Sequence, residues 1–220
     1  MDKPNFFAKT EHVSFSPDGV SVSLTLAVIG GEKERIRIPF EVYSKQVKGR
    51  SELSAEECET LESESDAYEA LCAGLRILSC GGNTRAELKR KLFARRHSSS
   101  SVERAVRTLA EDGYIDERAL VRDEVKRSIS KGYGPGRIYA RLVSRGFSKK
   151  YISLAMDKLE GYNFLPACKE MAEKKLRTLE KTVNEPAKKR EKLIVSLKNY
   201  GYSAECVRRA LNDIEELSET

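Results

Sequence analysis

The chain has 220 residues, of which 40% are hydrophobic and 34% charged, and it carries a net charge of +6. This composition is typical of a folded, water-soluble protein and excludes wholesale disorder. The longest strongly apolar stretch, residues 24–29, is far shorter than the roughly 20 residues that span a bilayer. The first residues also lack the apolar segment of a secretory signal, so we expect a cytoplasmic protein with no membrane association.

Two apolar runs near the N-terminus predict a small antiparallel β-meander. Hydrophobic residues alternate with polar or small ones from Val20 to Val28 and again from Ile36 to Val42, with Gly30-Gly31 between the runs. Val13 and Phe15 precede a turn signal and favour a third strand. Since three short strands are marginal alone, we expect the meander to pack against the helices that follow.

The end of this region is predicted from capping and charge. Ser54 and Glu57 have the spacing of a capping box, which predicts a short helix to about Leu61. The acidic segment 62–66 then predicts a domain boundary or the start of the next helix. We therefore place an N-terminal β extension with a short helix at residues 1–65.

An internal repeat follows this extension. When the sequence is aligned with itself so that His97, Phe147 and Tyr202 share one column, apolar residues recur at the same distances from that column without a gap. Their i, i+3, i+4, i+7 spacing marks the buried stripe of a helix, so each repeat predicts a helix–turn–helix pair. The columns are Leu88/Ile138/Leu193, Leu92/Leu142/Leu197, Val102/Ile152/Val207, Ala105/Ala155/Ala210, Val106/Met156/Leu211 and Leu109/Leu159/Ile214.

The turn inside each pair has its own signals. The residue before the aromatic column ends the first helix, and a serine after it is placed to cap the second. These residues are Arg96, Gly146 and Gly201, followed by Ser98, Ser148 and Ser203.

A further helix is expected before each pair, over 67–80 with Leu71, Leu75 and Leu78 on one face, over 116–130 and over 166–182. The predicted fold is therefore mainly α: three tandem three-helix repeats, at 66–116, 117–163 and 164–220, in an elongated curved array behind the β extension.

Side chains suited to catalysis are scarce. His97 fits a packing role in the aromatic column, and His12 has no Cys or second His nearby. The segment Gly132–Gly136 lacks the Lys-Ser/Thr of a phosphate loop, so it reads as a loop with Pro135 near a helix start. Five cysteines form no CxxC pair, which favours reduced thiols over a zinc site. We expect neither a catalytic, cofactor or metal site nor an enzyme.

Basic residues, by contrast, are concentrated after the β extension. Residues 1–66 contain 8 basic and 13 acidic residues, whereas 67–220 contain 32 and 21, and the stretch 117–162 alone contains 11 and 5. Within that stretch Arg118, Arg122 and Lys126 form one helical stripe, and Arg137, Arg141 and Arg145 form a second. The first repeat adds Arg85, Lys89, Arg90, Lys91, Arg95, Arg96, Arg104 and Arg107. Such stripes predict contact with a phosphate backbone or an acidic protein groove, although a solvated helix surface also explains them.

Three motifs give the chain a resemblance to a known family. They are Arg85-Ala-Glu-Leu-Lys-Arg-Lys-Leu92, Leu109-Ala-Glu-Asp-Gly-Tyr-Ile-Asp116 and Lys131-Gly-Tyr-Gly-Pro-Gly-Arg-Ile138. With Leu142 and Gly146, they resemble the RecX family of RecA regulators over about residues 67–160, and the third repeat more loosely. The chain departs from that pattern at Leu120-Val121, where an aromatic followed by Ala is usual, and at Arg96-His97, where Gly precedes an aromatic.

The resemblance implies a regulator that binds the filament of RecA recombinase on single-stranded DNA. It implies inhibition of strand exchange, ATP hydrolysis and co-protease activity, and thus a role in DNA repair and the SOS response. We expect a monomer whose binding residues include Arg85, Lys89 and both stripes of the second repeat, so that replacing Arg137, Arg141 and Arg145 weakens inhibition without loss of helix. The alternatives are a direct binder of single- or double-stranded DNA built from helix–turn–helix pairs, independent of RecA, and an adaptor for an unrelated protein.

Overall fold

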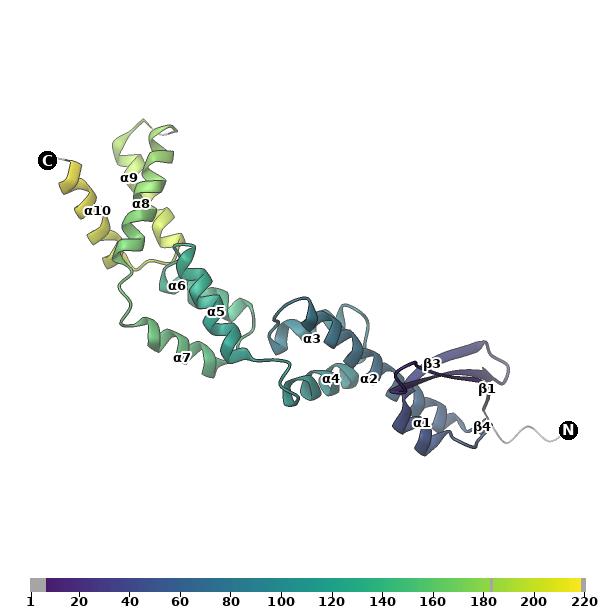
Figure 1. Cartoon of the computed structure of the whole chain (residues 1–220). Coiled ribbons are helices and arrows are strands. Elements are labelled where there is room, and N and C mark those ends of the chain that lie inside the picture. The colour runs from purple at the N-terminus through teal and green to yellow at the C-terminus, as the bar shows by residue number, and fades with distance from the viewer. Residues whose placement is uncertain (1–6, 183, 219–220) are drawn as a thin grey trace. The chain divides into compact units, whose positions relative to one another are not determined.

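The computed structural model describes residues 7–182 and 184–218 and divides the chain into two compact units, 1–115 and 116–220 (Figure 1). The first contains β1 (Ala8–Phe15), β2 (Ser21–Val28), β3 (Lys33–Pro39), α1 (Phe40–Gln46), β4 (Glu52–Leu53), α2 (Ala55–Ser79), α3 (Arg85–Phe93) and α4 (Ser99–Glu111). The second contains α5 (Glu117–Ser130), α6 (Pro135–Ser144), α7 (Lys149–Leu159), α8 (Leu165–Glu180), α9 (Pro186–Asn199) and α10 (Ala204–Ser218). A mainly α fold with a small antiparallel β segment is therefore confirmed.

The sheet has the strand order β3-β2-β1-β4, and every neighbouring pair is antiparallel. Leu24, Leu26 and Ile38 are fully buried and pack in one core with Cys58 and Leu61 of α2. The alternating pattern of β2 and β3 is thus confirmed, and so is packing against a helix. Two details differ. The strand β4 was not expected, because two residues are too few to show an alternating pattern, and the strand predicted to reach residue 42 ends at Pro39, the N-cap of α1.

The helix α2 is longer than the sequence predicts. The capping box is confirmed, because the Ser54 hydroxyl accepts a hydrogen bond from Glu57 N and the Glu57 carboxylate accepts one from Ser54 N. The prediction of a helix end near Leu61 is wrong, since α2 continues for 25 residues, whereas a domain boundary at 62–66 stays a prediction. Within α2, Ser65 and Ala67 are buried while Glu62 is exposed to solvent, so the acidic residues do not interrupt the helix.

The predicted stripe of α2 is confirmed for Leu71 and Leu78, which pack against the core, and is wrong for Leu75. Ala70, Ala73 and Ile77 are buried, whereas Leu75 is exposed and the other two leucines of the predicted stripe, residues 71 and 78, are half-buried. A Cβ atom on Gly74 would lie 2.5 Å from Leu109 Cδ1. Small residues therefore face α4 because the two helices pack too closely for leucine.

The helix pairs of the repeat are confirmed as α3–α4, α6–α7 and α9–α10, each preceded by α2, α5 or α8. Every residue of the aligned apolar columns is buried except Met156 and Ile214, which are half-buried. Arg96, Gly146 and Gly201 all have positive φ, as a left-handed helix end requires.

The serines of these turns differ in one respect. Ser98 and Ser203 accept hydrogen bonds from Ser101 N and Cys206 N, so both cap their helices. Ser148 stands at the N-cap of α7 without a side-chain bond, so the predicted cap is wrong there.

Candidate binding surface

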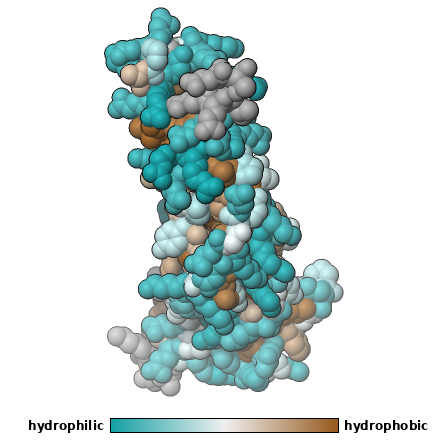
Figure 2. All heavy atoms as spheres, turned by 90° about the vertical axis from the view of Figure 1, so that its left-hand side faces the viewer, coloured by the Kyte–Doolittle hydropathy of each residue, from teal (hydrophilic) through white to brown (hydrophobic). Residues whose placement is uncertain are grey.

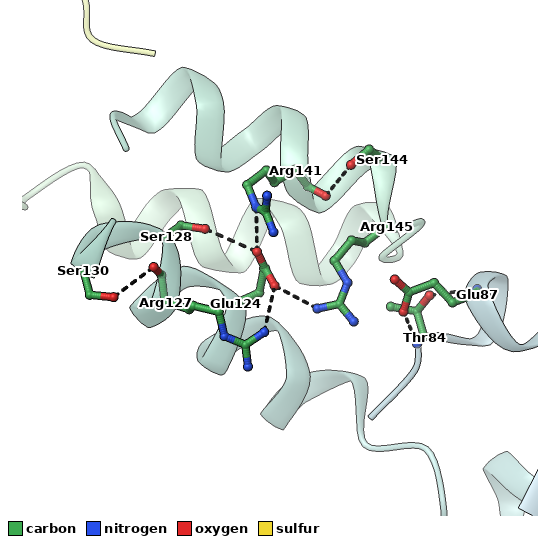
Figure 3. A network of polar contacts seen from close by, with 9 residues as sticks. All are labelled: Thr84, Glu87, Glu124, Arg127, Ser128, Ser130, Arg141, Ser144 and Arg145. Atoms are coloured by element: carbon green, nitrogen blue, oxygen red, sulfur yellow. Dashed lines mark hydrogen bonds and ion pairs between the residues drawn. The ribbon is translucent and has the colours of Figure 1, made fainter. Parts of the chain in front are cut away.

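Two of the three arginines in the second predicted stripe, Arg141 and Arg145, contact one buried carboxylate. Arg141 Nε donates to Glu124 Oε1 at 2.7 Å, and Arg145 Nη1 donates to Glu124 Oε2 at 2.9 Å. Ser128 and Arg127 reach the same group from α5, at 3.4 and 3.7 Å (Figure 3). Since the Glu124 side chain is only 2% exposed, α5 and α6 are joined by a buried ion cluster.

The cluster keeps Glu124 ionised. Burial by itself raises the pKa of the Glu124 carboxyl, but the hydrogen bonds from Arg141 and Arg145 outweigh it and hold the pKa below its ordinary value. These two arginines are therefore needed inside the molecule, because a buried carboxylate without partners is costly.

Arg137, the third residue of this stripe, contacts two aromatic rings. Its guanidinium carbon lies 4.4 Å from the ring centre of Tyr133 and 5.2 Å from that of Tyr200, and Nη1 donates to Asn199 O at 3.1 Å. Arg137 therefore links α6 to the end of α9, and the stripe as a whole is half-buried.

The glycine-rich segment before α6 also contacts the end of α9. Gly134 N donates to Tyr200 O at 2.8 Å and Gly136 N to Gly201 O at 3.0 Å. A Cβ atom on Gly134 would lie 2.5 Å from the Gly201 backbone. Pro135 is the first residue of α6, as expected, and the glycines permit two backbones to touch.

The stripe on α5 has a different environment. Arg118, Arg122 and Lys126 are all exposed, and among the described residues none of them has a hydrogen-bond or ion-pair partner. Like charges one turn apart repel, so the three cations are suited to an anionic partner.

In the first unit, Lys89 is paired with Glu103 across α3 and α4, and Arg85 is exposed at the start of α3. Arg104 is paired with Glu64 and Lys91 Nζ donates to Asn83, whereas Arg90 and Arg107 are exposed. The predicted site residues thus differ in their environments, and in the described part of the second unit the α5 stripe is the one whose three cations are all exposed and unpaired.

Three further features concern metal binding, membrane spans and His97. The described residues contain no group of three or more metal-binding side chains and no helix long and apolar enough to cross a membrane. His97 does not join the apolar core as predicted; its Nδ1 lies 2.7 Å from Asp66 Oδ1. Figure 2 shows a largely hydrophilic face with small, separate hydrophobic areas.

Sequence reasoning missed Glu124 and Tyr200. A signal was present for the first, because Glu124 lies three residues after Val121 on the buried stripe of α5. A carboxylate at such a position needs a cationic partner, and the neighbouring helix carries an arginine stripe. No local pattern indicates that Tyr200 stacks on a residue of another repeat.

Comparison with known proteins gives consistent results, although no family model matches the chain. It is 35% identical over 144 residues to a regulatory protein RecX of Chlorobaculum tepidum, covering 64% of this chain and 86% of the relative. It is 31% identical over 149 residues to that of Pelodictyon phaeoclathratiforme, covering 67% and 90%.

Solved structures agree in fold. A crystal structure of a regulatory protein RecX superposes with a TM-score of 0.70 at 18% identity, over 93% of this chain and 99% of the other. The RecX of Lactobacillus salivarius gives 0.56 at 20% identity, over 68% and 97%.

Proposed function

Since the chain belongs to the RecX family of regulatory proteins, we propose that it binds the RecA filament on single-stranded DNA and inhibits strand exchange, ATP hydrolysis and co-protease activity. In this role it restrains recombination in DNA repair and the SOS response. It acts by binding, without catalysis, in the cytoplasm.

The observation that carries the proposal is the exposed stripe of Arg118, Arg122 and Lys126 on α5. A filament of protein on DNA presents phosphates and acidic side chains at regular intervals. Three cations without internal partners gain more from such a surface than cations already paired with carboxylates.

An apolar stripe on α6 supports a protein partner rather than DNA alone. Tyr139 is 51% exposed and Val143 48% exposed, and the exposed Ala140 lies between them. Aromatic and aliphatic side chains at i, i+4 spacing are typical of a helix face that packs against another protein. A protein that binds only the phosphate backbone of DNA does not need exposed apolar side chains at its contact surface.

The test is inhibition of RecA. We expect the protein to lower ATP hydrolysis by RecA on single-stranded DNA in proportion to its concentration, and salt to weaken the effect. Salt-sensitive binding to naked DNA with unchanged hydrolysis would instead support the DNA-binding alternative. Cosedimentation with the filament that exceeds cosedimentation with free RecA or with naked DNA would separate the filament from its components.

A further inference from the structure

A hollow of about 410 Å³ in the first unit gathers cations from three separate segments. Arg37 comes from β3, Arg76 from α2, and Arg95 from the turn after α3. Glu69 is its sole acidic residue, and the remaining lining residues are Tyr68, Cys72, Ala73 and His97. The fold therefore brings three arginines to the lining of one concave site.

The charges in this hollow are not neutralised from within. None of the three arginines forms an ion pair with any described carboxylate, Glu69 included. Asp66 lies nearby, but its two oxygens are engaged by His97 Nδ1 at 2.7 Å and Ser98 N at 2.9 Å. Cations that line the same hollow repel one another, so an anion bound among them would relieve that repulsion.

Two of the arginines are held in position. Arg37 Nε donates to the buried Ser21 hydroxyl at 3.0 Å, its backbone N donates to Ser65 Oγ at 3.0 Å, and its guanidinium lies 5.4 Å from the centre of the Tyr68 ring. Arg95 Nη1 donates to Ala73 O at 3.3 Å. Each retains further N–H donors, and a fixed guanidinium loses less entropy on binding than a free one.

We propose that this hollow binds the phosphate group of a nucleotide in a single nucleic-acid strand. Guanidinium groups match phosphate oxygens with paired hydrogen bonds, and three arginines that line one hollow suit a compact anion with several acceptor oxygens. Tyr68 supplies a half-buried ring at the same place, on which a base can stack. This ring favours nucleic acid over an acidic protein segment.

The inference gives the N-terminal β segment a role, because Arg37 and its anchor Ser21 come from β3 and β2. It is independent of the proposed function: the hollow and the α5 stripe lie in different units, and binding of a strand needs no RecA. The two proposals therefore fail separately.

The test uses the full chain and a fluorescent 15-nucleotide oligothymidylate, with binding followed by anisotropy. We expect the R76E/R95E variant to bind about tenfold more weakly. The slope of log K against log salt should flatten by about 0.7 for each phosphate that the variant no longer neutralises. The control is R90E/R107E, which makes the same charge change in the same unit outside the hollow. When R118E/R122E is also present, R76E/R95E is still expected to weaken binding of the oligonucleotide more than R90E/R107E does.

Equal loss of affinity in both variants, or none in either, would overturn the proposal. Circular dichroism checks folding, and R76Q/R95Q, which removes charge without reversing it, replaces the first variant if that variant unfolds. In the unmodified chain the oligonucleotide should shift the Nε–Hε resonances of Arg37 and Arg95. A mononucleotide that shifts them with equal affinity would assign the site to free nucleotides, and stronger binding of an oligoglutamate would assign it to acidic protein; either result contradicts a strand.

Discussion

Arg141 of α6 donates a hydrogen bond, 2.7 Å long, to the buried carboxylate of Glu124 in α5. Replacing Arg141 with Ala leaves a carboxylate that is 2% exposed with Arg145 as its closest remaining cation. We expect this to lower the free energy of unfolding by about 2 kcal/mol, because charge-assisted hydrogen bonds to buried groups are among the stronger ones. Urea denaturation measures the effect.

The matched control is Arg118→Ala on the neighbouring helix. Arg118 is exposed and has no partner among the described residues, so its removal should change stability by no more than about 0.5 kcal/mol. Similar values for the two variants would contradict a structural role for Arg141.

A substitution at Arg96 is expected to increase stability rather than lower it. It follows α3 with φ of 66°, a left-handed conformation that costs a residue with a Cβ atom about 1 kcal/mol. The other two repeats have glycine there, Gly146 and Gly201. Arg96→Gly should therefore raise the melting temperature, whereas Arg90→Gly inside α3 should lower it. A lower melting temperature for Arg96→Gly would show that its side chain stabilises the turn.

Periodicity explains how much of this fold is predictable. The columns that begin with Leu88, Ile138 and Leu193 are buried because a repeated helix pair must repeat its apolar stripe. The left-handed turns were also visible, since glycine marks two of the three. By contrast, α2 was divided at residues 62–66 because acidic residues resemble a helix start, whether or not the helix already exists.

The candidate sites were less predictable because they depend on distant residues. A stripe of arginines at i, i+4, i+8 has the same appearance whether it meets solvent, as Arg118 and Arg122 do, or a buried carboxylate, as Arg141 does. The hollow joins Arg37 to Arg95, and no local pattern relates residues so far apart. Charge patterns thus identify candidates, and packing decides which of them remain accessible.

Asp66 makes part of the stability dependent on pH. Burial raises the pKa of this carboxyl, but hydrogen bonds from Ser98 and His97 outweigh it and lower the pKa to about 2, from 3.8 in an exposed aspartate. The folded state therefore binds this proton less readily than the unfolded state. The resulting stabilisation is fully present above about pH 4 and is lost as pH falls through 2, on the order of 2 kcal/mol in total.

We expect Asp66→Asn to be less stable than the unmodified chain at pH 7 and the difference to close as the pH approaches 2. Chemical denaturation at a series of pH values measures both. Asp112→Asn, which removes an exposed carboxylate elsewhere in the first unit, is the control for the change in net charge. A difference that stays constant with pH would mean that the Asp66 side chain acts through its shape rather than its charge.

The close contact between the start of α6 and the end of α9 can be tested by adding one methyl group, as Gly→Ala substitutions do. A Cβ atom on Gly134 would lie 2.5 Å from the carbonyl of Gly201, whereas one on Gly161 would have no neighbour within 4 Å. Neither glycine has positive φ, so the comparison isolates crowding. Gly134→Ala should destabilise the second unit by about 2 kcal/mol and speed hydrogen exchange in α9, while Gly161→Ala should not. Equal exchange rates would show that the two backbones separate at little cost.

The α5 stripe allows the proposed function to be tested without disturbing the core. Arg118 and Arg122 are exposed and have no partner in the described part of the chain, so reversing both charges should leave the fold intact. We expect the R118E/R122E variant to need at least about ten times more protein for half-maximal inhibition of ATP hydrolysis by RecA, because removing each cation from an anionic surface weakens binding severalfold. The control is K174E/K181E, the same charge change at exposed positions on and just after α8. If this control loses as much inhibition as R118E/R122E, total charge governs binding and the α5 stripe is not the contact surface. If neither variant loses any inhibition, the contact is made elsewhere, and the exposed Tyr139 and Val143 of α6 are the next residues to replace.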